Sequence, residues 1–253
     1  MPDFLVFQLY GVLASWGDIA VGEHRPSQGH PSKSAVTGLL AAALGIDRED
    51  DAVHMKLGQH YGVAVCVQSA GEMLRDYHTI QVPGGKREYA SRRDELRLPG
   101  MNPKTGKSNI ETILSQRDYR TDALYQISIW STDDSGPFTL GELQQALQHP
   151  QFNLYLGRKS CPVSLPLHPV ILSCMTLKQA FSDYPSIMAE DWIGNLVSTS
   201  LISYFWELGN LKEEELGMKA SMTYPRRDLV SSRKRWQFSN RDEYYYAEAL
   251  QRK

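Results

Sequence analysis

The sequence predicts an α+β fold in which a β-α-β-β-α-β unit fills residues 1–175 and a smaller strand-rich part follows over residues 176–253. Strand-like and helix-like apolar segments follow one another in that order along the first part. A long polar segment over residues 76–122 separates two of the strands, and aromatic and β-branched residues return after residue 196. With 253 residues, the chain can bury a core of its own without disulfides or metals.

The N-terminal segment predicts one strand, one irregular loop and one helix. Phe4–Leu9 has the alternation of a strand beside a core, and a loop rich in Gly, Ser and Pro follows it. A helix is expected over about 34–44, where apolar residues recur at helical spacing. Ser32 and Ser34 are its candidate N-caps, and Gly45 is suited to the position just after its end.

The elements that complete the unit are two strands, a helix and a further strand. Residues 61–68 and 124–130 are rich in branched and aromatic side chains, as strands are. Thr139 and Glu142 form a capping box for a helix, and residues 170–175 predict the last strand. This order is that of a ferredoxin-like unit, the frame of RNA-recognition modules. In the C-terminal part we expect a short helix after Thr176 and a strand within residues 197–207.

The segment over residues 76–122 predicts an extended basic hairpin. Connections in compact domains rarely exceed about 12–15 residues, and longer ones usually carry function. The net charge of −2 hides an uneven distribution, because Arg75–Arg120 holds ten Lys or Arg against six acids and Lys219–Arg241 holds seven against one. Asp183–Glu215 is acidic instead, with seven acids and one Lys. This asymmetry predicts surfaces that face a polyanion on an otherwise acidic body.

Several classes of protein are not supported by the sequence. No apolar run approaches the length of a membrane span, and the N-terminal residues have no secretory pattern, so a cytoplasmic location is expected. Cys66, Cys161 and Cys174 are widely separated and predict reduced packing residues, neither a disulfide framework nor a metal site. Signatures of metallohydrolases and serine hydrolases are missing from the sequence, and no cofactor is expected.

Several stretches resemble, in order, the CasD family of type I-E CRISPR systems. They are LYGVLASWGD (9–18), RPSQGHPSKSAVTGLL (25–40), LRDYHTI (74–80), ETILSQRDYR (111–120), YLGRKSCP (155–162) and, more loosely, residues 225–238.

The resemblance implies a non-catalytic subunit of the Cascade surveillance complex in a prokaryotic cytoplasm. Such a subunit caps the crRNA and holds its 5′ handle. Its hairpin, the thumb, packs against a CasC-type backbone subunit, and a CasA-type large subunit is a further partner. Target DNA is reached only through the complex, and no membrane is involved.

Two segments are candidates for the handle site. Ser32, Lys33 and Ser34 lie at a predicted helix N-terminus, where free N–H groups and the helix dipole favour an anion and Lys33 adds a charge. Simple capping by the two serines explains them equally well. The second segment combines the stacking surface of Tyr155 and the close backbone approach allowed by Gly157 with two adjacent cations, Arg158 and Lys159. A solvated turn with surface cations is the alternative.

Further cations complete the candidate set. Arg25 belongs to the second resembling stretch, and Arg226 and Arg227 lie in the basic tail, where a salt bridge with Asp228 is the alternative. The resemblance places Arg117 as a thumb arginine beside a kinked nucleotide. His78 belongs to the thumb candidates, and four further arginines could bind the RNA backbone, although a solvated charged face explains them at least as well: Arg87, Arg92, Arg93 and Arg120.

Two other functions remain open, and so does the role of one aromatic. Tyr77, His78 and Lys86 could serve a metal-independent endoribonuclease that processes the crRNA precursor, with a base at the 2′-OH and a cation at the phosphate. The acidic segment instead suits a protein-interaction scaffold with little direct RNA contact. Trp16 is expected to pack in the core or an interface and not to stack on a base.

Overall fold

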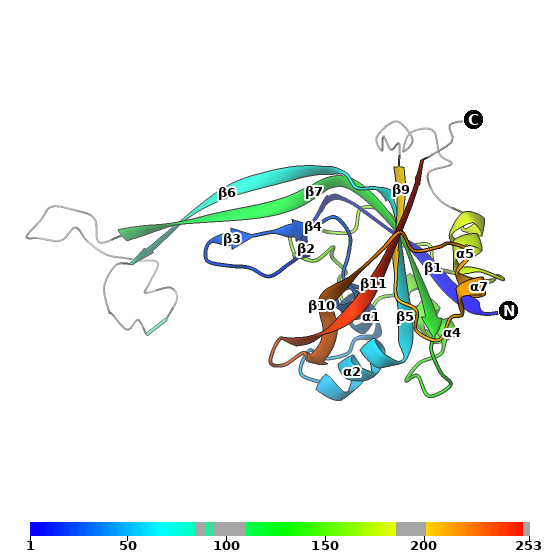
Figure 1. Ribbon diagram of the computed structural model, residues 1–253. Helices are drawn as coiled ribbons and strands as arrows, with labels where there is room; N and C mark the ends of the chain where they lie inside the picture. The colour runs from blue at the N-terminus through cyan, green and yellow to red at the C-terminus, as the bar shows by residue number, and fades with distance from the viewer. Residues whose placement is uncertain (84–89, 92, 94–109, 186–200, 250–253) are drawn as a thin grey trace, which may run out of the picture.

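The structure is a computed structural model and describes residues 1–83, 90–91, 93, 110–185 and 201–249. It is a mixed α/β chain with a large, mostly antiparallel sheet (Figure 1). The strands are β1 (Asp3–Ala14), β2 (Trp16–Gly17), β3 (His24–Arg25), β4 (Ser27–Gln28), β5 (Tyr61–Ser69), β6 (Glu72–Pro83), β7 (Ile110–Ser131), β8 (Val170–Ser173), β9 (Leu201–Trp206), β10 (Met222–Ser232) and β11 (Gln237–Ala249). The helices are α1 (Lys33–Leu44), α2 (Asp51–Gln59), α4 (Leu140–Gln148), α5 (Leu177–Asp183) and α7 (Glu213–Leu216).

Among the described residues, nine strands form the main sheet in the order β10-β11-β9-β5-β7-β1-β8, with β3 and β6 paired to β7 beside this row. Strand β1 is antiparallel to both neighbours, β7 and β8, and β7 is antiparallel to β5. All four strands predicted for residues 1–175 therefore lie side by side.

Both faces of the sheet are covered. This explains why the apolar run of β1 is nearly continuous. Leu5, Phe7 and Leu9 point into one apolar cluster, while Phe4 and Val6 point into the other. Side chains of successive strand residues face opposite sides, so a strand covered on both sides needs apolar residues at each position. Helices α1, α2 and α4 cover the first face, and α5 and α7 cover the second.

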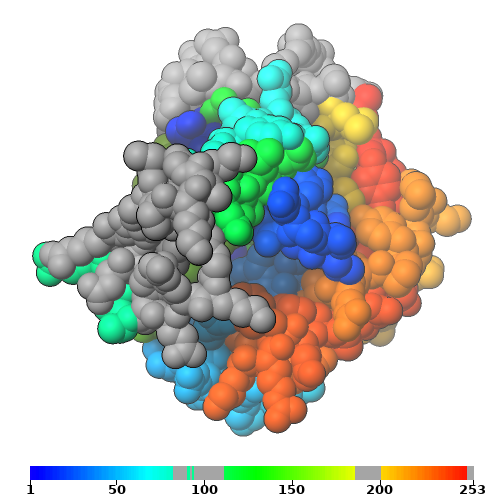
Figure 2. Space-filling model, turned by 90° about the vertical axis from the view of Figure 1, so that its left-hand side faces the viewer, coloured from blue at the N-terminus to red at the C-terminus, as the bar shows by residue number. Residues whose placement is uncertain are grey.

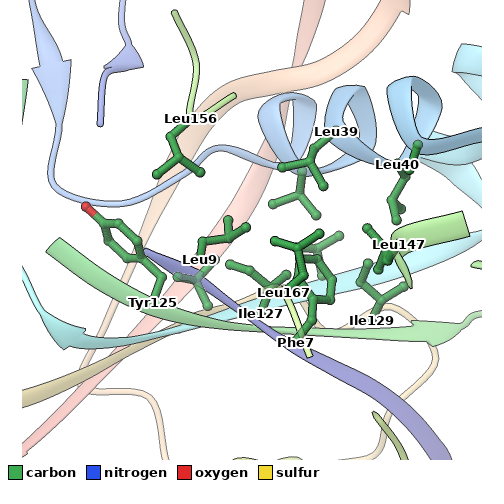
Figure 3. Close-up of a cluster of buried hydrophobic side chains, with 14 of the residues drawn as sticks. Phe7, Leu9, Leu39, Leu40, Tyr125, Ile127, Ile129, Leu147, Leu156 and Leu167 are labelled. Carbon is green, nitrogen blue, oxygen red and sulfur yellow. The ribbon is translucent and has the colours of Figure 1, made fainter. Parts of the chain in front are cut away.

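The predicted helix over 34–44 is confirmed as α1. The Ser32 side chain caps it by accepting a hydrogen bond from the Ala35 amide, and Gly45 ends it in the left-handed region with φ 73°. Leu39 and Leu40 project from α1 toward Phe7 and the other side chains of the larger apolar cluster (Figure 3). The capping boundaries and the core face of this helix were thus both readable from sequence.

Two other predicted helix starts are confirmed. Thr139 and Glu142 form the expected capping box at α4, with the Glu142 carboxylate 2.7 Å from the Thr139 amide nitrogen. Thr176 caps α5 by accepting from the Gln179 amide at 3.1 Å. Helix α2 was not predicted, because its short sequence is mostly polar.

The long hairpin is confirmed over the described parts of its two legs. Strands β6 and β7 pair from Glu72 opposite Thr121 to Pro83 opposite Ile110, and the ribbon extends well away from the body (Figure 1). Strand β7 continues past Asp122, where φ is +53°, into the middle of the main sheet. The thumb is therefore continuous with the core, because one strand belongs to both.

The C-terminal part adds strands to the same sheet. Strand β9 pairs with β5 and β11, and β10 pairs with β11. The strand expected within residues 197–207 is found as β9, and residues 186–200 of the acidic segment lie outside the described residues. The β10–β11 hairpin in the basic tail was not predicted. A domain division after residue 175 stays a prediction.

Candidate nucleic-acid interface

Segments far apart in the sequence meet where the thumb joins the body, and we call this place the thumb base. It comprises Ser15, His24, Arg25, Arg75, residues 117–120 and the glycine loop 155–159. Strand β3 runs parallel to β7 there, with Arg25 opposite Arg117. The glycine loop is joined to the same place because the Ser15 amide donates to the Leu156 carbonyl at 3.0 Å.

Asp118 is the buried acid of the thumb base, with 3% of its surface exposed. Its carboxylate accepts hydrogen bonds from Arg75 Nε at 2.8 Å and Nη2 at 3.1 Å, and His24 Nε2 lies 3.0 Å away. The Arg75 guanidinium, with a smaller contribution from His24, lowers the pKa of this carboxyl below its ordinary value. The negative charge of Asp118 is thus already matched by neighbouring groups.

Arg158 connects three parts of the thumb base. Its guanidinium lies 4.7 Å from the centre of the Tyr119 ring. It donates to the Asp118 carbonyl at 3.2 Å and to the Arg25 carbonyl at 3.1 Å. These partners are neutral, and within the described chain no carboxylate forms an ion pair with Arg158. The positive charge of Arg158 therefore remains available to an anion.

The glycine loop is shaped by contact with the protein itself. Gly157 has φ +86°, and a Cβ atom at this position would lie 1.8 Å from the Ser15 carbonyl oxygen. We expected Gly157 to let the backbone approach RNA closely. In the structure, its backbone approaches the Ser15 carbonyl instead. Tyr155 is 39% exposed, and Lys159 is exposed beside it. The loop thus presents one aromatic ring and one cation to solvent.

The predicted thumb residues differ in burial and in their contacts, and two of them lie outside the described residues. Arg117 is half-buried on β7, and Arg120 approaches Gly29, with its Nε buried and without a hydrogen-bond partner among the described residues. His78 Nδ1 lies 2.9 Å from Asp76 Oδ2. Arg93 is exposed, and Arg87 and Arg92 lie outside the described residues.

The N-terminus of α1 is occupied by the protein's own groups. The Lys33 amide donates to Asp228 Oδ2 at 2.7 Å, and the Lys33 ammonium pairs with Glu207 at 2.5 Å. Ser32 and Ser34 hydrogen-bond to each other at 3.0 Å. Because Asp228 of β10 lies where a phosphate was expected, an anion would have to displace a carboxylate. This contact could not be predicted from the sequence, because Lys33 and Asp228 are far apart along the chain.

Arg226 and Arg227 have different surroundings. Arg226 is inside a buried network with the Glu243 carboxylate at 2.9 Å and the Asp228 carboxylate at 3.6 Å, so the salt-bridge alternative describes it. Arg227 is exposed and donates from Nε to the Phe238 carbonyl at 3.1 Å. The first is bound within the protein, and the second reaches the surface.

The residues named for an endoribonuclease do not form one cluster in the described chain. Tyr77 and His78 are successive residues of β6 and so face opposite sides of the hairpin. Tyr77 accepts a hydrogen bond from Gln116 at 2.8 Å, whereas His78 contacts Asp76. Lys86 lies outside the described residues.

Trp16 is buried and packs edge to face against Tyr125, so its predicted packing role is confirmed. Sequence reasoning overlooked Arg75, Asp118 and Tyr119, which organise the thumb base. Their signal was weak: Arg-Asp-Tyr-Arg at 117–120 alternates charge, but the pattern does not say which side chains turn inward.

Comparison with known proteins identifies the family. A family model described as CRISPR-associated protein (Cas_Cas5) matches residues 4–242. The chain belongs to this family. The Cas5-family chain is 32% identical over 177 residues to the CRISPR system Cascade subunit CasD of Escherichia coli (strain K12), covering 66% of this chain and 70% of that protein. The resemblance to CasD is thereby confirmed.

Solved structures agree with the fold of this Cas5-family chain. One, titled CRISPR RNA-guided surveillance complex, superposes with a TM-score of 0.62 at 22% identity, covering 98% of this chain and 90% of the other. A second, titled crystal structure of Cas protein, gives 0.58 at 24% identity, covering 98% and 94%. Within the described chain, the helices are too short or too polar to cross a bilayer.

Proposed function

We propose that this chain is a non-catalytic subunit of a type I-E Cascade complex and that it holds the 5′ handle of crRNA at the thumb base. The observation that carries the proposal is the convergence of Arg25, Arg117, Arg158 and Lys159 at one place. In the described chain none of these cations forms an ion pair with a carboxylate. Unpaired cations beside an aromatic ring suit a single-stranded RNA backbone.

The frame that presents these groups is proposed to be a ferredoxin-like unit. Four strands lie in the order β8-β1-β7-β5 and alternate in direction, with α1 following β1 and α4 following β7. This order supports the assignment, because it is the fourth, first, third and second strand of a β-α-β-β-α-β chain. The thumb is then an extension of the connection between the second and third strands.

The thumb is proposed to pack against a CasC-type backbone subunit. Its described legs expose apolar side chains that a solvated hairpin does not need, among them Met73, Tyr77 and Leu114, at 53%, 62% and 44% exposure. The same proposal includes contact with a CasA-type large subunit. Target DNA is reached only through the complex, and both parts rest on family membership.

A non-catalytic role is preferred to an endoribonuclease. General acid–base cleavage needs a base and a stabilising cation at one phosphate. Tyr77 and His78 are directed to opposite sides of the hairpin, so the two side chains do not meet at one scissile bond.

The test uses the full chain with labelled crRNA precursor and with a control RNA whose handle is scrambled. We expect handle-dependent retention of intact RNA. Arg25→Ala combined with Lys159→Ala should lower the slope of log affinity against log salt by about 1.4, since each single-strand phosphate contact contributes about 0.7.

The matched control is Lys212→Ala, because Lys212 is exposed beside α7, on the side of the body away from the thumb (Figure 1). This variant should leave the slope unchanged. Metal-independent cleavage at the handle boundary would replace the proposal with the endoribonuclease. Equal retention of both RNAs, with an unaltered slope in the double variant, would favour the interaction scaffold.

A further inference from the structure

The turn between β10 and β11 carries a second group of cations, separate from the thumb base. We call Arg48, Arg233, Lys234, Arg235 and Trp236 the Trp236 patch. Arg233–Trp236 form the turn, and Arg48 joins them from the segment before α2. The basic tail noted in the sequence therefore divides in the fold: Arg226 and Arg241 are used in buried ion pairs, whereas the turn residues reach the surface.

Two guanidinium groups are held on one aromatic ring. The Arg48 Cζ lies 4.3 Å and the Arg233 Cζ 4.5 Å from the centre of the Trp236 ring, and Trp236 is 54% exposed. Stacking fixes the plane of a guanidinium but leaves the N–H groups at its edge free. Those edges match the paired oxygens of a phosphate.

The turn is fixed from beneath by Asp51. Its carboxylate accepts from the Ser232 hydroxyl and from the Lys234 amide, each at 2.7 Å. The Lys234 amide, followed by Ser232, lowers the pKa of Asp51 below its ordinary value. Asp50, meanwhile, accepts from the Val53 amide as the cap of α2. These acids bind backbone and hydroxyl donors and shape the turn, and within the described chain neither forms an ion pair with its basic side chains.

Among the described residues, the cations of the Trp236 patch have no acidic partner. Within the described chain, the four basic side chains have no carboxylate at ion-pair distance, although Glu49 is exposed nearby in sequence. Arg233 and Arg48 are close enough to repel, and burial together with this repulsion lowers the pKa of Arg233. Two like charges held together without a counterion are a costly arrangement unless an anion binds there.

The patch lies near the glycine loop of the proposed handle site. Arg233 lies over α1, where its Nη2 is 3.5 Å from the position of a Cβ on Gly38, and Tyr155 of the glycine loop is among the groups close enough to affect Arg233 electrostatically. Figure 2 shows the orange β10–β11 turn on the same face of the molecule as the blue segment containing β3 and green β7. One strand of nucleic acid can therefore follow this face from the thumb base past Tyr155 to the turn.

We propose that the Trp236 patch binds phosphodiester oxygens of the crRNA strand outside the segment held at the thumb base, with Arg48 and Arg233 as the phosphate ligands. This inference rests on the proposed function and extends it to a second contact. Trp236 is a positioning residue, because its ring orients both guanidiniums. RNA is favoured over an acidic protein because the patch shares its face with the thumb base and because paired planar guanidiniums suit phosphate.

The experiment compares variants of the full chain by filter binding across a salt series. The probes are a single-stranded RNA with the handle and adjoining spacer, a single-stranded DNA of the same sequence, and a DNA duplex. Arg48→Gln with Arg233→Gln should lower the RNA salt slope by about 1.4 and weaken binding about tenfold at moderate salt. Lys212→Ala is the charge control, and thermal unfolding of each variant checks that the fold is kept.

Trp236 supplies a second, independent variant. Trp236→Leu keeps every charge, so a purely electrostatic surface would bind RNA as before. We expect it to weaken RNA binding by several-fold, and we expect Trp236→Phe to restore much of that loss, because a phenyl ring still holds a guanidinium.

The outcomes separate the two proposals. If the Arg48 and Arg233 double variant binds all three probes normally while the Arg25 and Lys159 variant is impaired, the patch inference is overturned and the handle site stands. If both variants bind normally, both proposals fail. If the patch variant loses affinity only for duplex DNA, the occupant is target DNA, and the assignment to crRNA is wrong.

Discussion

At the scale of single residues, the thumb base depends on a few positions with exact requirements. Asp118 is buried and accepts hydrogen bonds from Arg75, with His24 Nε2 close by, while Arg158 uses carbonyls and an aromatic ring and has no carboxylate partner among the described residues. The charge of Arg75 is thus matched by the Asp118 carboxylate, whereas the charge of Arg158 is left for a ligand. This division cannot be inferred from residue type, because both side chains are arginines.

Gly157 supplies the first prediction at this scale. Gly157→Ala places a methyl group against the Ser15 carbonyl and forces alanine to φ +86°, so it should lower the free energy of unfolding by about 3 kcal/mol. Urea unfolding of the purified chain measures this. Gly17→Ala is the matched control, because no atom lies within 4 Å of the added Cβ. Equal stabilities of the two variants would contradict the role of the Ser15 contact.

At the scale of elements, the β10–β11 hairpin is joined to the segment just before α1 by a buried ionic network. Arg226 and Arg241 share Glu243, Arg241 also binds Asp228, and His30 lies 3.0 Å from Glu243 while stacking on Phe205. Arg226 also contacts His30 Nε2, the nitrogen that faces Glu243. His30 is buried among these groups, and burial disfavours its charged form.

This network predicts a loss of stability on acidification. Burial lowers the pKa of His30 from 6.5 to about 4, so below pH 6.5 the unfolded chain takes up a proton that the folded chain does not. Stability should fall by up to about 1.4 kcal/mol per pH unit between those values.

The pKa of Glu243 is lowered to about 2 because its partners, His30 and the two arginines, outweigh the opposing effect of burial. Its contribution is lost as the pH falls from 4.5 toward that value.

The measurement is the free energy of unfolding against pH for the natural chain and for His30→Gln, which cannot titrate. The variant should be less stable at neutral pH but should have a flatter profile between pH 6.5 and 4. Parallel profiles would show that His30 does not carry the effect. Because Glu243 remains in the variant, the decline at lower pH should persist in both proteins.

At the scale of the whole molecule, the two sides of the thumb hairpin are available to different partners. In the register of β6 and β7, Tyr77 and Leu114 lie on one side of the hairpin, and His78 and Arg117 lie on the other. The Leu114 side carries exposed apolar groups, but the Arg117 side also exposes Leu74 and Ile113. We expect a protein neighbour to cover Tyr77 and Leu114, and nucleic acid to approach Arg117 where the hairpin joins the body.

Leu114→Asp tests the expected protein contact. The change should prevent or weaken assembly with the proposed backbone subunit by at least tenfold, because a charge would enter an apolar contact, and it should leave the proposed binding of the isolated handle within twofold. Co-purification of the complex and RNA binding by the single chain measure the two effects. Met222→Asp is the control, since Met222 is an exposed apolar residue of β10 outside the thumb. Normal assembly with Leu114→Asp would refute the apolar contact.

The sequence by itself determined the elements whose signals are local: the caps of α1, α4 and α5, the buried strands, the long hairpin and the family to which the chain belongs. Periodicity and capping depend on residues a few positions apart, so they can be read along a chain. Tertiary structure decided which cations remain free. Lys33 and Arg226 are neutralised by distant acids, and Arg48 and Arg233 meet on Trp236, because pairing of charges depends on distance in space and not along the chain.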